Sequence, residues 1–350
     1  MKPKFLIIGA AGNTGSATAL ELLEKGYSVR AFVRKADHRS EKLHQKGADI
    51  CVGSLTNLAD VEHALKGIQS AYFVAPWEKE QLQMAMTFVV AAKNSPQLKS
   101  IVALTQWLAS PEHPSQATRE SYLTDQIFSL LPDIHHTTIN TGWFAQNYMP
   151  DEILTMVTQL GMFPFPLGSG KTAPVSNEDI ARVVTACLLS PEEHSGKTYR
   201  PTGPELLSPE DIAATFSTIL ERNVKYDNIS EKLFLKALNL MGMSPHMQCQ
   251  LQHYIKDYQT GAFEKGAPNS IVEQITGRKA ENFETIARRY LGNFELTEAN
   301  LSNKTQALIG FIKLLLSPAT NLEKYALSQG QSTPSSSRYA MASEKWLQQH

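Results

Sequence analysis

The chain has 350 residues, of which 42% are hydrophobic and 19% charged, with 33 Lys and Arg against 34 Asp and Glu. This composition excludes a disordered or collagen-like chain, and a net charge of −1 gives no basic field for nucleic acid or an anionic membrane. Its three cysteines, Cys51, Cys187 and Cys249, are too few for a disulfide framework, and no apolar run is long enough for a signal peptide or a membrane span. We therefore expect a cytoplasmic protein.

Short apolar runs alternate with helical patterns through the first 104 residues. The runs predict strands at 5–8, 29–33, 49–52, 71–74 and 100–104, and the segments between them predict helices at 17–25, 37–46, 58–65 and 79–93. This alternation indicates βαβ units around a parallel sheet. We expect an α/β, Rossmann-type doubly wound domain over residues 1–150, completed by elements within 174–205.

Helical patterns prevail beyond residue 150. Ser176 with Asp179 predicts a capping box, Ser208-Pro209 predicts a second helix start, and a short strand is expected at 197–200. We expect a smaller, mostly helical substrate-side region over 151–316. The polar, Ser-rich segment 317–350 predicts a loosely packed, solvated extension, with the docking of a protein partner as the alternative.

A glycine-rich turn follows the first predicted strand and opens the first helix; it consists of Gly9, Ala10, Ala11, Gly12, Asn13, Thr14 and Gly15. Free N–H groups at a helix start hold a dinucleotide pyrophosphate, and glycines permit the tight turn and the close approach of the backbone. A purely structural turn would also need glycines, and the spacing G-x-x-G-x-x-G differs from the general G-x-G-x-x-G fingerprint. The flanking strand and helix supply the required context, so the turn predicts dinucleotide binding.

The end of the second predicted strand indicates which dinucleotide. Arg34 and Lys35 stand about twenty residues beyond the turn, where an NAD-binding fold usually offers an acid to the ribose. A basic residue there accommodates the 2′-phosphate of NADP, and the nearest acid, Asp37, lies further on. A solvated charge at a strand end is the alternative. The sequence favours NADP(H).

Six segments together resemble the NmrA-like family of atypical short-chain dehydrogenase/reductase proteins. They are GAAGNTG (9–15), FVRK (32–35), GADICVGSL (47–55), PVSNEDIARVV (174–184), GKTYRPTGPELLSPEDIA (196–213) and TGRKAENFETIARRY (276–290). The resemblance implies a Rossmann fold with a small C-terminal substrate domain and NADP as the preferred nucleotide. The family includes NADPH-dependent quinone, azo-dye and triphenylmethane-dye reductases, and nucleotide-sensing regulators that do not turn over substrate.

The resemblance also implies positions along the cofactor. The glycine turn would hold the pyrophosphate and Arg34 the 2′-phosphate. Ser54 and Leu55 would lie near the adenine, with Ser54 in place of an acid common in the family. Pro76 would lie along the cofactor after the fourth strand, and Thr105 would lie near the nicotinamide at the end of the fifth.

The usual catalytic pair of the superfamily is missing. Its dehydrogenases use Tyr-x-x-x-Lys, in which the lysine lowers the pKa of the tyrosine so that it can exchange a proton. No tyrosine of this chain is followed by lysine four residues on. Tyr122 fits an E-x-Y-L pattern of the family, but Gln116 stands where many members have lysine. Thr105 and Tyr122 remain as catalytic candidates, and a quinone, whose reduced anion takes a proton from water, would not need the pair.

Four aromatic residues are candidates to stack a flat substrate beside the nicotinamide: Trp77, Trp107, Trp143 and Phe144. The last two lie in a segment that resembles the family's R-P-G-x-F-x-E-N, with Asn140 replacing the arginine. Ordinary core packing is an equal alternative for each.

Two other patterns carry no site. Gly168–Thr172 ends like a P-loop, but Phe165 replaces its first glycine, so we expect a surface turn. His135-His136 has no third ligand at a useful spacing, and no metal site is expected.

The sequence favours an NADPH-dependent reductase of a flat, electron-poor small molecule such as a quinone or azo compound. The alternative is a catalytically silent NADP(H) sensor that binds a protein partner.

Overall fold

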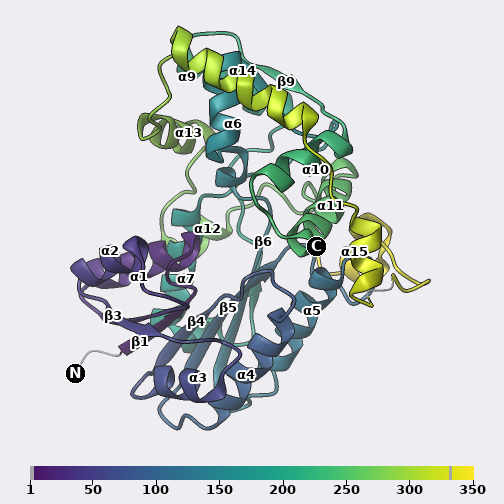
Figure 1. Ribbon diagram of the computed structural model, residues 1–350. Coiled ribbons are helices and arrows are strands. Elements are labelled where there is room, and N and C mark those ends of the chain that lie inside the picture. Colours follow the sequence, from purple (N-terminus) through teal and green to yellow (C-terminus); the bar gives the residue numbers. More distant parts are fainter. Residues whose placement is uncertain (1–3, 331–332) are drawn as a thin grey trace.

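The computed structural model describes residues 4–330 and 333–350 and consists of two lobes (Figure 1). The lower lobe is built on a seven-stranded sheet in the order β3-β2-β1-β4-β5-β6-β8. All its neighbouring strands pair in parallel, and they are β1 (Lys4–Ile8), β2 (Ser28–Val33), β3 (Asp49–Val52), β4 (Ser70–Phe73), β5 (Ser100–Gln106), β6 (His135–Thr141) and β8 (Thr198–Tyr199). The predicted Rossmann-type doubly wound fold is confirmed.

Helices cover both faces of this sheet. They are α1 (Asn13–Glu24), α2 (His38–Gln45), α3 (Leu58–Leu65), α4 (Gln81–Lys93), α5 (Gln116–Phe128), α7 (Asn177–Leu189), α8 (Pro191–His194) and α12 (Ile271–Thr276). Phe5 and Ile7 of β1 join the core beneath α1 and α7, whereas Leu6 and Ile8 join the core beneath α3 and α4. Burial on both faces explains the uninterrupted apolar runs of these strands.

Elements within 174–205 join the lower lobe. The helix α7 packs against α1, and β8 extends the sheet beside β6. The Ser176 hydroxyl caps α7 by accepting a hydrogen bond from the Asp179 N–H at 2.9 Å. The reciprocal bond of a capping box is not formed there, because the Asp179 carboxylate accepts from the Glu281 N–H and pairs with Arg182.

The upper lobe is mainly helical. It contains α6 (Asp151–Thr155), a π-helical turn η2 (Met156–Leu160), α9 (Pro209–Leu220), α10 (Glu231–Leu240), α11 (Pro245–Gln259), α13 (Phe283–Gly292), α14 (Leu301–Leu316) and α15 (Leu322–Ser328), with a two-stranded sheet of β7 (Met162–Pro164) and β9 (Lys225–Asp227). Its core is rich in aromatic rings, including Tyr148, Phe163 and Phe216. A short 3-10 turn, η1 (Ala145–Tyr148), leads into this lobe from β6.

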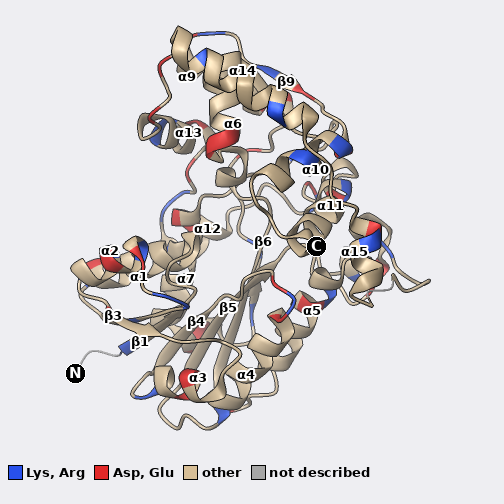
Figure 2. Cartoon of the chain, viewed as in Figure 1, with Lys and Arg blue, Asp and Glu red and all other residues tan. Residues whose placement is uncertain are grey.

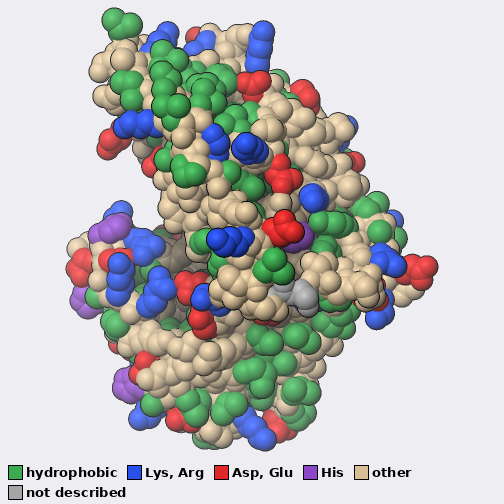
Figure 3. All heavy atoms as spheres, turned by 45° about the vertical axis from the view of Figure 1, so that its right-hand side comes forward, with side chains coloured by type: hydrophobic (Ala, Val, Ile, Leu, Met, Phe, Trp, Pro, Cys, Tyr) green, Lys and Arg blue, Asp and Glu red, His purple; other side chains and the backbone are tan. Residues whose placement is uncertain are grey.

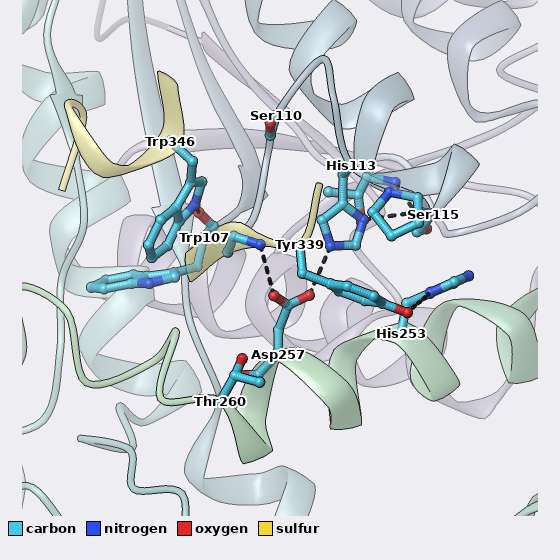
Figure 4. Close-up of polar contacts among 12 residues, drawn as sticks. Trp107, Ser110, His113, Ser115, His253, Asp257, Thr260, Tyr339 and Trp346 are labelled. Carbon is cyan, nitrogen blue, oxygen red and sulfur yellow. Dashed lines mark hydrogen bonds and ion pairs between the residues drawn. The ribbon is translucent and has the colours of Figure 1, made fainter. Parts of the chain in front are cut away.

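The expectation of a loosely packed extension is wrong for residues 340–346, where buried side chains anchor the end of the chain although most of its last residues are exposed. Two short turns, η3 (Ala340–Ala342) and α16 (Glu344–Leu347), return between the lobes, where Ala340 and Trp346 are fully buried. Figure 4 shows the Trp346 ring beside Trp107. Trp346 donates its indole N–H to the carbonyl of Trp107 at 3.0 Å. The segment 317–350 is polar on average, and this composition gives no sign of the few apolar residues that anchor it.

A buried carboxylate fastens this segment. Asp257 of α11 accepts hydrogen bonds from His113 Nε2 at 2.7 Å and from the Ala340 N–H at 2.9 Å (Figure 4). Because His113 Nδ1 accepts from the Ser115 N–H at 3.0 Å, its proton sits on Nε2 and points at Asp257. One side chain of the upper lobe therefore joins a loop of the lower lobe to the end of the chain.

Candidate nucleotide-binding cleft

The glycine turn connects β1 to α1 at the point where the strand order reverses, between β1 and β4. Gly9 has a left-handed backbone with φ of 66°, and a Cβ there would lie 2.9 Å from Val74 Cγ1. A Cβ on Gly15 would collide with the carbonyl oxygen of Gly9. These two glycines are needed for the turn and for the packing of α1 on the strand.

Gly12 and the N-terminus of α1 face the cleft. Gly12 is the N-cap residue of α1 and supplies no side-chain cap, and the first turn of the helix contains no acidic residue. Gly12, Asn13 and Thr14 line the cleft together with Gly9 and Ala11. N–H groups at a helix start attract anions, so this cradle fits a pyrophosphate. Ala10 is fully buried in the core beneath α1 and does not line the cleft.

Basic side chains lie where β2 ends. Arg34, Lys35 and Arg39 line the same cleft, and Figure 2 shows basic segments next to α2 on the side that faces the upper lobe. Arg34 forms an ion pair with Glu78 at 3.0 Å, and its side chain is 77% exposed. The Arg34 guanidinium can therefore contact a ligand in the cleft once its exposed ion pair with Glu78 breaks.

The nearest acid is already engaged. Asp37 is the N-cap of α2 and accepts from the backbone N–H groups of Arg39 and Ser40. It also pairs with the Arg39 guanidinium at 2.7 Å, and that side-chain hydrogen bond holds the pKa of the Asp37 carboxyl far below its usual range. These contacts saturate the carboxylate, so it is not oriented toward a ribose hydroxyl.

Ser54 and Leu55 follow β3 and line the cleft beside Phe32. The Ser54 N–H donates to Asp60 at 2.9 Å, and its hydroxyl lies 2.8 Å from that of Thr56. The acid common in the family at position 54 is thus absent, while a hydroxyl remains at the cleft wall.

Pro76 and three of the four predicted aromatic residues line the cleft: Trp77, Trp143 and Phe144. Trp143 is only 5% exposed, and its indole N–H has no hydrogen-bond partner among the described residues. Trp107 does not line the cleft. It is 2% exposed and donates its N–H to the Ala262 carbonyl at 2.9 Å, so core packing accounts for it.

Neither catalytic candidate borders the cleft. Alternation along β5 turns Leu104 toward the cleft and Thr105 toward α5, where Thr105 accepts from Asn140 Nδ2 at 2.6 Å. Tyr122 lies half-buried on α5, and Gln116, in place of the family lysine, donates to Glu120 at 2.7 Å. The chain therefore presents neither of these hydroxyls to a ligand in the cleft.

A buried acid behind Thr105 escaped the sequence analysis. Asp125 of α5 accepts from Asn140 Nδ2 at 3.2 Å, and its second oxygen has no partner among the described residues. Burial raises the pKa of Asp125 to about 7, although hydrogen bonds from Thr105 and Asn140 and the charge of Arg200 oppose the shift. No motif marks Asp125, because α5, β5, β6 and Arg200 meet only in the folded chain.

Within residues 4–330 and 333–350 no cluster of three or more His, Cys, Asp or Glu side chains could hold a metal ion. His136 lies in β6 between two neighbouring strands, and burial lowers its pKa to about 4. Over the same residues, none of the helices has the length and apolarity to cross a bilayer.

The chain resembles several characterised proteins over most of its length. It is 28% identical to an NAD(P)H azoreductase of Xenophilus azovorans over 294 residues, covering 83% of this chain and 98% of the relative. Its fold superposes with a TM-score of 0.70 on the NADPH complex of the quinone oxidoreductase QOR2 of Escherichia coli, at 21% identity, covering 83% of this chain and all of the other. Triphenylmethane reductase of Citrobacter sp. complexed with NADP(H) gives a TM-score of 0.69 at 17% identity, over 82% of this chain and 99% of the other.

The family assignment follows from a match that spans most of the chain. The sequence profile of the NmrA-like family matches residues 1–291, which include the glycine turn, the whole seven-stranded sheet and the upper lobe as far as α13. The chain belongs to the NmrA-like family.

Proposed function

We propose that this protein is a cytoplasmic NADPH-dependent reductase of flat, electron-poor small molecules of the quinone or azo-dye type. One observation carries the proposal: a continuous cavity of about 1540 Å³ joins the anion cradle at Gly12 to the aromatic residues Trp77 and Trp143. It exceeds the ~300–1,000 Å³ of ordinary ligand pockets and therefore has room for a dinucleotide and an acceptor together. The NAD(P)H azoreductase and the quinone oxidoreductase among its relatives support this reading.

The cofactor fits the residues present. The N-terminus of α1 would hold the pyrophosphate, and Arg34 would pair with the 2′-phosphate after leaving Glu78. A bound nicotinamide supplies the hydride, and the chain orients it, shapes the cleft and excludes water. Electrons and protons balance when NADPH and one proton convert a quinone to a hydroquinone and NADP⁺.

The chain's own contribution to proton transfer is small. Tyr122 lies outside the cleft, so we propose that water supplies the proton for the reduced acceptor. The Trp143 N–H has no partner among the described residues and is buried at the cleft wall. We propose that a small rotation of the indole ring brings this N–H to an acceptor carbonyl or azo nitrogen, where it would stabilise the developing negative charge. This arrangement suits acceptors whose reduced anions are stable, and it does not suit ordinary ketones or aldehydes.

The test is NADPH oxidation with a panel of quinones, azo dyes and aldehydes. We expect turnover of quinones or dyes and none of aldehydes. Trp143→Phe keeps an aromatic ring but removes the N–H, so we expect kcat/KM for quinones to fall about 5–30-fold, the value of ~1–2 kcal/mol, with the Kd of NADPH unchanged. If NADPH binds and no acceptor of the panel is reduced, the reductase assignment fails and the sensor alternative is correct.

A further inference from the structure

The cavity continues beyond the aromatic residues into the upper lobe. There its walls come from η2, α10, α11 and α14, and its side chains are mostly apolar, including Met156, Phe165, Phe234, Leu238, Met241 and Phe311. Methionines and aliphatic chains of this kind adapt to a flexible apolar ligand. The end of the cavity away from the nucleotide turn is thus suited to hydrocarbon rather than to a second polar group.

One wall of this region lies outside the segment that matches the family. The matching segment ends at residue 291, and α14 begins at Leu301. The helix packs on η2 and α10, and Lys236 of α10 donates a hydrogen bond to the Leu315 carbonyl. Gly310, Phe311 and Leu314 of α14 line the cavity. The additional helix therefore lengthens an apolar wall on a scaffold that the family shares.

The two faces of α14 differ in environment. Ala307 is 4% exposed, whereas Ile309 and Ile312 are 48% and 54% exposed on its outer face. Figure 3 shows hydrophobic side chains gathered on the upper lobe, where α14 lies. Lys313 lines the cavity beside Leu314, so its ammonium group can reach water while its stem covers the wall.

We propose that the electron acceptor carries a long hydrocarbon chain. This hydrocarbon chain lies between α10 and α14, and the ring of the acceptor lies beside Trp143. This inference rests on the proposed function and names the substrate class more closely: a quinone with an alkyl or isoprenoid chain. The hydrocarbon chain of the quinone takes no part in the reaction, in which NADPH and one proton still reduce the quinone to a hydroquinone. The hydrocarbon chain contributes to binding, because its methylene groups are buried against the side chains of α10 and α14.

The experiment compares two quinones with the same head group, 2,3-dimethoxy-5-methyl-1,4-benzoquinone without a chain and with a decyl chain. Each methylene that becomes fully buried raises kcat/KM by up to about fourfold. We expect the decyl quinone to be favoured at least tenfold over the chainless one. Each concentration is kept below that at which the decyl compound forms micelles.

Gly310→Phe tests whether the hydrocarbon chain of the quinone lies between α10 and α14. A Cβ on residue 310 meets no atom within 4 Å, so the backbone accepts the side chain, and its ring would occupy the cavity. We expect the preference for the decyl quinone to fall to within about threefold of unity. Ile309→Phe is the matched control, because it adds a ring at the neighbouring position on the outer face and should retain the preference.

The outcomes separate the two proposals. If wild type reduces both quinones with equal kcat/KM, the proposed site for the hydrocarbon chain (the chain site) is wrong and the reductase assignment stands. If it reduces neither, the reductase assignment fails, and quenching of tryptophan fluorescence by each quinone then tests the chain site alone. A tenfold tighter Kd for the decyl compound, lost in Gly310→Phe and kept in Ile309→Phe, supports the site. Equal Kd values for the two quinones overturn it.

Discussion

Arg34→Ala is expected to lower the preference for NADP over NAD about tenfold. A charge-assisted hydrogen bond to the 2′-phosphate contributes ~1.5–3 kcal/mol, but the Arg34 side chain is 77% exposed and therefore screened by water. Breaking the exposed ion pair with Glu78 costs up to ~1 kcal/mol. Lys35 and Arg39 also line the cleft and retain part of the attraction. The net loss should be about 1.4 kcal/mol, a tenfold weaker Kd for NADP⁺.

Titration calorimetry with NADP⁺ and NAD⁺ checks this value. The Kd of NAD⁺ should stay unchanged, since NAD⁺ has no 2′-phosphate. Glu78→Gln should have the opposite sign and tighten NADP⁺ binding by about two- to fivefold, because it frees Arg34 and removes a negative charge. Lys42→Ala on α2 is the matched control, an exposed cation that does not line the cleft. If Arg34→Ala weakens both nucleotides equally, or neither, the assignment of Arg34 is wrong.

Four further outcomes follow from the structure. Tyr122→Phe should leave quinone turnover within about twofold of wild type, since the hydroxyl is outside the cleft; the ~10²–10⁴-fold loss typical of a missing general acid would show that it is catalytic. Gly12→Val should abolish NADP⁺ binding, because its side chain would project into the cradle, and calorimetry would detect retained binding. Trp346→Ala should lower the free energy of unfolding in urea by ~3–5 kcal/mol, as expected for a buried tryptophan, and a loss below 1 kcal/mol would contradict its anchoring role. Burial raises the pKa of Asp125 to about 7 in the folded chain, so folding favours its protonated form and this stabilisation is lost as pH rises from about 4 to 7. Asp125→Asn should therefore gain stability relative to wild type over that window, and a pH-independent difference in urea midpoint would refute the shift.

Much of the lower lobe could be predicted because its signals are local. The strand at 49–52 and the helix at 58–65 have the predicted bounds, since each is delimited by its own turn and cap residues. Helix α1 begins at Asn13, earlier than the expected residue 17, because its N-terminus is formed by the glycine turn rather than by an apolar stripe. The sequence does not predict β6 (His135–Thr141), because its histidines and threonines lack an apolar pattern and depend on β5 for pairing.

Predictions for the cleft divide in the same way. Gly12, Arg34 and Ser54, each placed by the end of a strand, line the cavity, whereas Thr105, placed in the same way at the end of β5, faces α5. Trp107 does not line the cavity, because its environment is set by Ala262 and Trp346, which are 155 and 239 residues away along the chain. Long-range packing of this kind leaves no trace in local sequence, and it also concealed Asp125 and the wall formed by α14.

The contacts of Asp257 bear on how the protein unfolds. They join His113 to a residue 144 positions later and to Ala340 a further 83 positions on, and the Trp107–Trp346 bond spans 239 positions. Each contact needs both lobes folded, so unfolding of one lobe alone would leave the buried Asp257 and His113 without their partners, which is unfavourable. The lobes should therefore lose structure in one cooperative step rather than in sequence, and the amides of the loop that carries His113 should exchange with solvent as slowly as those of the sheet.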